Sequence, residues 1–169
     1  VGLAHRALAV EDSNDYIWLG TDGGVSRFDG VTFENFTSEN GLAVNGVQAI
    51  HEDSTGRIWL GHRGGGITRY NGKSFERLEI FSMFLDSDVT SFSEDHDGNL
   101  WITTAGDGII CIWNPEADQD ELKYEHYLGK RLSDQVFQSY IGRDGTLYLI
   151  TDIGIKKYNR TENDFDQFY

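Results

Sequence analysis

Short runs of β-branched and aromatic residues recur along the whole chain, and polar residues rich in glycine, aspartate and asparagine separate them. Typical runs are VQAIHED, GRIWLGH and GGITRYNG. Such runs are typical of β-strands, and the residues between them are typical of tight turns. No window shows sustained spacing of apolar residues by three or four positions, which helices require. The pattern therefore predicts an all-β fold.

The apolar runs repeat with a regular period that the tryptophans mark. Trp18, Trp59 and Trp101 are spaced by 41 and 42 residues, and Tyr148 follows 47 residues later. Each unit contains four runs, which predicts a four-stranded antiparallel meander. We expect a single domain over residues 1–169 with units at 1–37, 38–79, 80–127 and 128–169.

The residues between the runs indicate which turns connect the strands. Asp29-Gly30 and Asn71-Gly72 stand between apolar runs, which predicts type I′ hairpins with positive φ at both central residues. In each unit the turn between the first and second strands has one position where a residue with positive φ is expected. That position is occupied by Asp15, Gly56, Gly98 and Gly145.

Four-stranded units with a period of roughly 40 to 45 residues predict the blades of a β-propeller. A single sheet of this size cannot bury both faces, so successive blades must pack on one another. A closed ring of four blades is one arrangement, and four blades of a larger propeller are another. In the second case the first and last blades each expose an apolar face, and such faces favour self-association.

Two segments carry a family resemblance. The residues DYIWLGTDGGVSRFDG and GRIWLGHRGGGITRYNG, with the connector GLAVNGVQAIHED, resemble the two-component regulator propeller repeat. The third copy matches in part, and the fourth has Tyr148 in place of tryptophan. The resemblance implies a seven-bladed sensor propeller in the periplasmic part of a membrane-anchored bacterial hybrid protein. Further blades and a kinase part would complete that protein, which often regulates carbohydrate use.

Charge and composition narrow the classes of partner. The chain has a formal net charge of −14, which disfavours binding to nucleic acid or to an anionic membrane surface. Cys111 is the sole cysteine, so no intramolecular disulfide can form. The five histidines have no metal-binding spacing, and no cofactor or nucleophile motif occurs. These observations favour a non-catalytic protein without a cofactor.

The repeated aromatic residues Trp18, Trp59, Trp101 and Tyr148 allow two interpretations. They could form a platform for sugars, but their recurrence in every unit favours packing between blades. The segment from Asp95 to Asn99 likewise resembles part of a calcium loop. It lacks the remaining oxygen ligands, so a hairpin turn is the favoured interpretation.

A ligand site is expected on the face where connectors between blades meet the turns between second and third strands. There the second copy departs from the repeat, because His62-Arg63 replaces the usual threonine and adds a residue; drift explains this departure equally well. Residues expected on this face are Asp22, Asn45, His62, Arg63, Asp88, Thr104, Asp107 and Asp152.

Two arginines recur in the third strand. Arg27 and Arg69 share a predicted rim with the repeated Glu-Asp pairs, and an unpaired guanidinium between blades would be costly. We therefore predict a structural role for both arginines, with ion pairs to Glu11, Asp12, Glu52 or Asp53 rather than an anion site. In the fourth copy Lys157 would serve Glu94 or Asp95 across the boundary between blades.

These observations predict a non-enzymatic sensor segment whose parent protein recognises a small molecule or oligosaccharide. A scaffold that binds another protein is a competing interpretation. A third is a lyase, because propeller lyases that open cyclic peptide antibiotics have similar G-x-[IV]-W blades.

Overall fold

The computed structural model describes residues 8–82, 85–128 and 135–169, which form four four-stranded sheets. We call these sheets blades 1 to 4. Blade 1 contains β1 (Leu8–Glu11), β2 (Ile17–Thr21), β3 (Gly24–Phe28) and β4 (Phe33–Phe36). Blade 2 contains β5 (Val47–Glu52), β6 (Ile58–His62), β7 (Ile67–Tyr70) and β8 (Phe75–Arg77). Blade 3 contains β9 (Val89–Glu94), β10 (Leu100–Thr104), β11 (Ile109–Ile112) and β12 (Tyr124–Tyr127). Blade 4 contains β13 (Val136–Ile141), β14 (Leu147–Thr151), β15 (Gly154–Asn159) and β16 (Asp164–Gln167).

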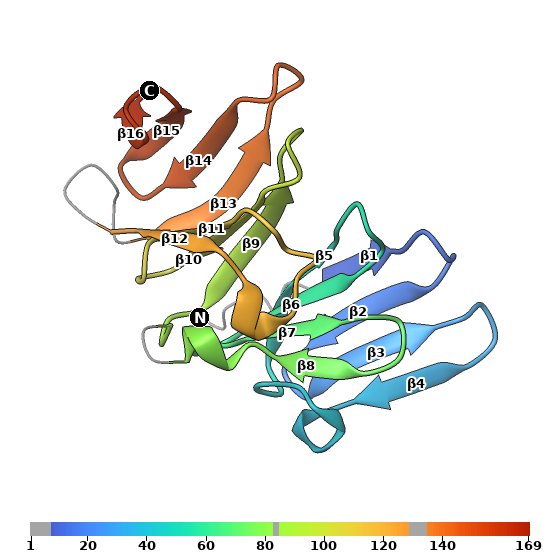
Figure 1. Cartoon of the computed structure of the whole chain (residues 1–169). Coiled ribbons are helices and arrows are strands. Elements are labelled where there is room, and N and C mark those ends of the chain that lie inside the picture. Colours follow the sequence, from blue (N-terminus) through green and yellow to red (C-terminus); the bar gives the residue numbers. More distant parts are fainter. Residues whose placement is uncertain (1–7, 83–84, 129–134) are drawn as a thin grey trace.

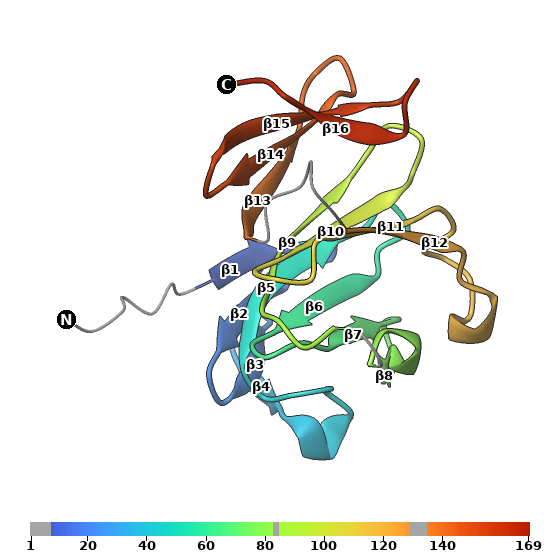
Figure 2. The same ribbon diagram turned by 90° about the vertical axis from the view of Figure 1, so that its left-hand side faces the viewer.

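Every blade is an antiparallel meander in which strands neighbour one another in sequence order, so the predicted all-β propeller fold is confirmed. Figure 1 shows the blades arranged one after another as a fan, and Figure 2 shows the same order from the side. The first strands lie on the inner side, where β5 is beside β9 and β9 is beside β13. The described part of the chain also has three short 3₁₀ helices outside the strands, at Ser38–Asn40, Glu79–Phe81 and Gln119–Glu121.

Among the described residues the core consists of three clusters, and each lies between two blades. Trp18 of blade 1 packs against residues of blade 2, Trp59 of blade 2 against blade 3, and Trp101 of blade 3 against blade 4. Trp18 and Trp59 are fully buried, and Trp101 is 3% exposed. Because large aromatic side chains contribute most to core stability, these contacts hold neighbouring blades together.

The turn predictions are correct for the first hairpin of each blade and wrong for the hairpin between the third and fourth strands. Asp15, Gly56, Gly98 and Gly145 all have positive φ, between 63° and 81°. The predicted type I′ hairpins are wrong, because Gly30 and Gly72 have positive φ but Asp29 and Asn71 do not. Instead the Asp29 carboxylate accepts amide N–H groups from Val31 and Thr32. Asn71 does the same one blade later, so both connections are wider loops closed by a side chain.

Candidate functional site

The aspartate of the repeated Glu-Asp pair organises the first hairpin of blades 1 to 3. Asp53 accepts a hydrogen bond from Trp59 Nε1 at 2.7 Å, and its other oxygen accepts amide N–H groups of Thr55 and Arg57. Asp12 and Asp95 make the same contacts with Trp18 and Trp101, at 2.7 and 2.9 Å. These carboxylates therefore satisfy the buried indole N–H groups, as buried donors require.

The glutamate of the pair connects each hairpin to the blade before it. Glu52 of blade 2 accepts the amide N–H and the hydroxyl of Ser13 in blade 1, at 2.8 and 2.5 Å. Glu94 of blade 3 does the same with Ser54 in blade 2, at 2.6 and 2.5 Å. We call this contact the Glu–Ser latch. It joins the blades at the rim, on the side opposite the connectors.

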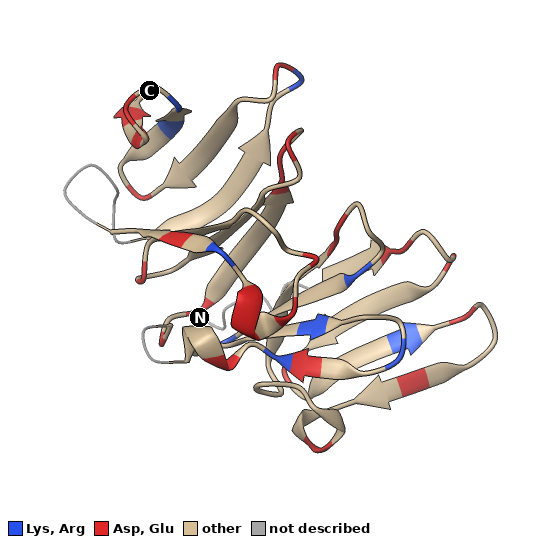
Figure 3. Ribbon diagram, in the orientation of Figure 1, with Lys and Arg blue, Asp and Glu red and all other residues tan. Residues whose placement is uncertain are grey.

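The acids of the repeated Glu-Asp pairs are therefore not the ion-pair partners of Arg27 and Arg69. Arg27 pairs with Glu34, and Arg69 pairs with Glu76 at 2.6 Å. Figure 3 shows this arrangement as basic residues on β3 and β7 beside acidic residues on β4 and β8. The predicted ion pairs to Glu11, Asp12, Glu52 or Asp53 are wrong, because each arginine has a carboxylate directly opposite on the adjacent strand.

Both arginines also make contacts between blades. Arg27 donates to the Tyr70 hydroxyl of blade 2 at 3.1 Å, and its guanidinium lies 4.6 Å from the Tyr16 ring centroid. Arg69 is 4% exposed and donates to the backbone carbonyls of Pro115 and Ala117 in blade 3. These contacts place the two residues in the packing of the propeller.

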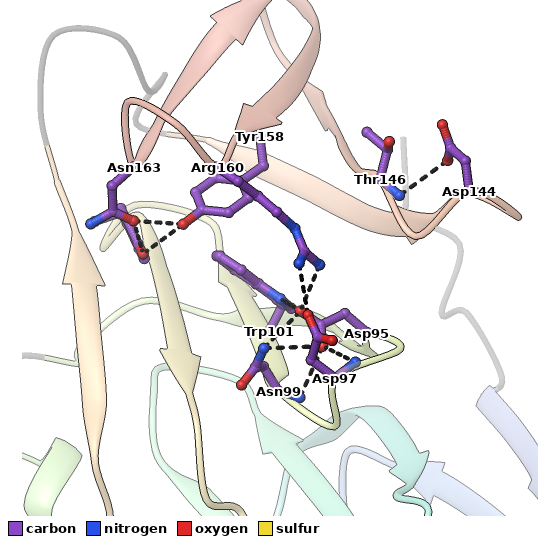
Figure 4. A network of polar contacts seen from close by, with 10 residues as sticks. Asp95, Asp97, Asn99, Trp101, Asp144, Thr146, Tyr158, Arg160 and Asn163 are labelled. Carbon is purple, nitrogen blue, oxygen red and sulfur yellow. Dashed lines mark hydrogen bonds and ion pairs between the residues drawn. The ribbon is translucent and has the colours of Figure 1, made fainter.

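The junction between blades 3 and 4 is built differently. The position of the latch glutamate is occupied by Ile141, and that of the aspartate by Gly142. Arg160 crosses the boundary instead, with 2.7 Å to Asp97 and 4.0 Å to Asp95 (Figure 4). The predicted pairing of Lys157 with Glu94 or Asp95 is therefore wrong, because Arg160 makes the contact across this boundary. Lys157 lies opposite Asp166 within its own blade.

The Asp95 carboxylate accepts hydrogen bonds from Asp97, Asn99 and Trp101 within its own blade. Burial would raise the pKa of its carboxyl group, but hydrogen bonds from Trp101, Asn99 and the Asp97 amide outweigh burial and hold the pKa below its ordinary value. The segment from Asp95 to Asn99 is a hairpin turn closed by this carboxylate. Within the described residues, no group of three or more His, Cys, Asp or Glu side chains is arranged to hold a metal ion.

A pocket of about 430 Å³ lies where the latch is missing. Its walls come from the first hairpins of blades 3 and 4, and from β15 and the loop after it (Figure 4). The lining residues are His96, Asp97, Asp144, Gly145, Thr146, Leu147, Tyr158 and Arg160. This pocket was not predicted from the sequence, although the loss of the Glu-Asp pair in the fourth copy marks its position.

On the connector face, several predicted ligand residues hold the turns of their own blades. Thr104 donates to the Gly108 carbonyl at 2.9 Å and accepts the Asp107 amide N–H at 2.8 Å. Thr21 and Thr151 occupy the same place in blades 1 and 4. His62 replaces this threonine in blade 2, and its Nε2 lies 2.8 Å from Thr68 Oγ1. Burial lowers the pKa of His62 to about 4, so the ring is neutral at pH 7.

The remaining predicted residues divide into connector supports and exposed groups. Asn45 accepts the Ser38 amide N–H, and Asp107 accepts those of Asp86 and Ser87. Asp88 accepts the amide N–H of Gly64 at 2.7 Å.

The exposed groups on this face come from neighbouring blades. Arg63 pairs with Asp22 of blade 1 at 3.3 Å, and both side chains are more than half exposed. Asp152 is also exposed. The structure therefore places Arg63, Asp22 and Asp152 where a ligand could reach them.

Comparison with known proteins supports the family resemblance. Residues 41–64 and 79–106 match the two component regulator propeller family. The matched residues lie in the second and third predicted copies, and the resembling segment of the first copy lies outside them. No curated protein matches the chain.

Solved structures share the fold over almost the whole chain. The extracellular domain of a protein described as a hybrid two component system, from B. thetaiotaomicron, has a TM-score of 0.81 at 24% identity. A second such domain from the same organism has a TM-score of 0.69 at 19% identity. The alignments cover 96% and 87% of this chain, and 22% and 20% of those proteins. The chain therefore spans about a fifth of their length.

An enzyme has a similar fold. Virginiamycin B lyase from Staphylococcus aureus, in a structure with quinupristin, has a TM-score of 0.71 at 16% identity. That alignment covers 99% of this chain and 58% of the lyase. Since all of these identities are below 25%, the likeness establishes a propeller fold and leaves the activity to be inferred. In the described residues no helix has the length and apolar character needed to span a membrane.

Proposed function

We propose that this chain is a non-catalytic, ligand-sensing propeller segment in the extracytoplasmic part of a bacterial two-component signalling protein. The observation that carries this proposal is the combination of the family repeats with a TM-score of 0.81 to an extracellular domain of that class. The periplasm is the corresponding location, and a kinase part of the parent protein would receive the signal.

The ligand class that we propose is a small neutral molecule rich in hydroxyl groups, such as an oligosaccharide. The chain carries a net charge of −14, which disfavours anionic ligands. On the connector face, Arg63 and Asp22 offer a donor and an acceptor from two blades within 3.3 Å of each other. Asp152 adds an exposed acceptor from blade 4. Paired donors and acceptors of this kind can bind adjacent hydroxyl groups.

A glycan-binding screen followed by calorimetry tests the proposal with the whole chain. We expect Arg63→Ala to weaken binding of any glycan hit by about tenfold, the value of one charge-assisted hydrogen bond. Arg57→Ala is the matched control, because Arg57 lies in a first hairpin on the opposite rim and donates to the Glu116 carbonyl. Equal effects of the two substitutions would contradict the assigned face. Absence of binding to every glycan would contradict the ligand class.

The lyase likeness supports a second candidate, a propeller enzyme acting on cyclic peptide antibiotics. Incubation of the chain with quinupristin, followed by mass spectrometry, separates this candidate from the sensor. We expect no turnover. Ring opening that scales with the concentration of the chain would replace the sensor proposal with the enzyme. Co-purification of one stoichiometric protein, with no glycan bound, would instead favour a protein-binding scaffold.

A further inference from the structure

The first hairpins of blades 1, 2 and 3 share one backbone arrangement, although their sequences differ. In each of them the capping aspartate accepts the amide N–H of the residue two positions later, as Asp95 does from Asp97. In blades 1 and 2 the residue between these two is Ser13 or Ser54. Its amide N–H donates to a carboxylate oxygen of the latch glutamate, at 2.8 and 2.6 Å. This position of the hairpin therefore supplies a backbone donor that binds a carboxylate.

Blade 3 keeps this donor but lacks the carboxylate. His96 occupies the serine position, and Ile141 of blade 4 occupies the position of the latch glutamate. The His96 ring lies against Gly145, with Nδ1 3.2 Å from the point where a Cβ would stand, as Glu52 lies against Gly56 in blade 2. Among the described residues the His96 amide N–H has no hydrogen-bond acceptor. It is therefore available to a carboxylate from a ligand.

The pocket of about 430 Å³ at this junction is lined by His96 and also by a cation, Arg160. Arg160 Nη1 donates to Asp97 at 2.7 Å, and the side chain is 59% exposed. This bond leaves the other N–H donors of the guanidinium open, and a guanidinium binds carboxylates through paired N–H groups. The pocket thus has two kinds of donor for one carboxylate group.

An anion lines another part of the same pocket. Asp144 lies apart from the pair of Arg160 and Asp97, on the first hairpin of blade 4 (Figure 4). Its carboxylate accepts the Thr146 amide N–H at 3.1 Å and has no ion pair within the described residues. Hydrogen bonds from Thr146 lower the pKa of Asp144, so its carboxyl group is ionised at neutral pH. Asp144 can therefore bind a cationic group.

The charges of the pocket determine which ligand matches it. Its two aspartates outnumber its one arginine, and the chain as a whole carries −14, so a simple anion is disfavoured. A simple cation would be repelled by Arg160 and would leave the His96 amide N–H unused. A small molecule that carries both a carboxylate and an ammonium group matches both ends without adding net charge.

We propose that this pocket binds a small zwitterion of the α-amino acid type. Its carboxylate contacts Arg160 and the amide N–H of His96, and its ammonium group contacts Asp144. The ring of Tyr158 lines the pocket as well and contacts the side chain of the ligand. The site is separate from the connector face, and the proposal does not rest on the glycan class proposed above.

The pocket does not depend on what adjoins the chain in a larger propeller. All of its lining residues belong to blades 3 and 4, which are both present. A further blade would pack on the opposite face of blade 4, where Tyr148 stands in the tryptophan position. The junction that forms the pocket is therefore complete.

Matched ligands test the two charged groups separately. Calorimetry of the whole chain with the common free amino acids, at up to about 10 mM, identifies the best ligand. The amide of that amino acid lacks the carboxylate, and its N-acetyl derivative lacks the ammonium group. We expect each derivative to bind at least about tenfold more weakly, the value of one charge-assisted hydrogen bond. No glycan enters this measurement, so its outcome is independent of the test of the connector face.

Two variants remove one charge each from the pocket. Arg160→Gln and Asp144→Asn should each weaken binding of the same amino acid by at least about tenfold. The matched controls are Arg57→Gln and Asp15→Asn, which alter first hairpins on the same rim in blades 2 and 1. Both controls should stay within about twofold of the unmodified chain, as expected for charges outside the pocket. Thermal unfolding of every variant checks that its fold is retained.

Amide resonances give a readout at the donor itself. In heteronuclear NMR spectra the His96 amide should shift when the amino acid is added. The amides of Ser13 and Ser54 should stay in place, because each already donates to a glutamate of the chain.

The proposal is wrong if no free amino acid binds in the calorimetric screen. It is equally wrong if a derivative lacking one charge binds as tightly as the amino acid, or if the pocket variants behave like their controls. A shift of the two serine amides without one at His96 would also overturn it.

Discussion

Blades 1 and 2 are joined by different residues at the rim from those that join blades 3 and 4, although both pairs pack around a buried tryptophan. In the first junction Trp18 is capped by Asp12, and Glu52 latches onto Ser13. In the second, Trp101 is still capped by Asp95, but Ile141 stands in the latch position. Arg160 and a pocket of about 430 Å³ occupy the rim there.

This difference separates two functions of the repeated acids. The aspartate is needed wherever a tryptophan is buried, because the indole N–H requires an acceptor. The glutamate is needed only for the rim, since blades 3 and 4 stay packed without it. Apolar packing therefore holds the blades together, and the polar contacts at the rim can vary between junctions.

The largest expected effect comes from removing the tryptophans. Trp59→Ala and Trp101→Ala should each lower the free energy of unfolding by about 3–5 kcal/mol, as large core truncations do. Similar values in urea titrations would show that packing is equally strong in both kinds of junction. Trp113→Ala is the control, because Trp113 is 49% exposed and its loss should be nearly neutral. A value below about 1 kcal/mol for Trp59→Ala would contradict the packing role.

The next effect concerns the capping aspartates. Asp53→Ala should destabilise by about 1–3 kcal/mol, because it leaves the buried Trp59 N–H without an acceptor. For Asp95, whose pKa is held below its ordinary value of 3.8, the stabilisation is present above that value. It is lost as the pH falls through the lower pKa of the folded state.

Urea titrations between pH 7 and pH 2.5 should therefore show a smaller acid-induced loss of stability for Asp95→Asn than for the unmodified chain. Asp118→Asn serves as the comparison, because Asp118 precedes an exposed 3₁₀ turn and makes no side-chain capping bond. An identical pH profile for Asp95→Asn and the unmodified chain would show that this carboxylate does not stabilise the folded state.

A smaller effect on stability is expected from building a Glu–Ser latch between blades 3 and 4, where it is absent. His96→Ser with Ile141→Glu recreates the two halves of the latch between blades 3 and 4. Each substitution alone removes packing, but together they should show a favourable coupling of about 0.5–1 kcal/mol in a double-mutant cycle. Thermal unfolding of the four proteins gives this coupling. No coupling would show that the latch depends on the shape of its own junction.

The smallest effect is expected for Arg160→Ala. The Arg160 side chain is 59% exposed, so its pair with Asp97 should contribute less than about 1 kcal/mol. We expect the difference from the unmodified chain to disappear at 1 M NaCl, where the screening length falls to about 3 Å. A loss that persists at high salt would indicate that the buried carboxylate of Asp95 is the more important partner.

The repeat spacing, the four meanders and the four-stranded sheets all follow from patterns visible in the sequence. Pairing by charge predicts Arg27 beside the Glu-Asp pair, but charge alone does not identify partners. Glu34 lies directly across the sheet, while the Glu-Asp acids bind hydroxyl, indole and amide donors that carry no charge. The pocket was missed because it arises from residues lacking in one copy, and its walls come from two blades.

The predicted ligand residues of the connector face show why the sequence could not identify a binding site. Thr104, Asn45 and Asp107 lie on the predicted face, yet their polar atoms bind the backbone of their own turns and connectors. From sequence, a residue that closes a turn and a residue that faces a ligand have the same composition. Only the positions of the neighbouring amide groups distinguish them.

The Glu–Ser latch has an evolutionary consequence, because each repeat carries one half of the contact at either side. Ser54 and Glu52 belong to the same blade, so a tandem duplication of that blade would produce a new junction with both halves already matched. Nearest-neighbour stability in repeat proteins means that such a duplication requires no compensating change elsewhere. A blade with this rim could therefore be duplicated or deleted without leaving an unmatched contact, whereas blade 4, with Ile141 and Gly142 at these positions, has no latch glutamate for the blade before it.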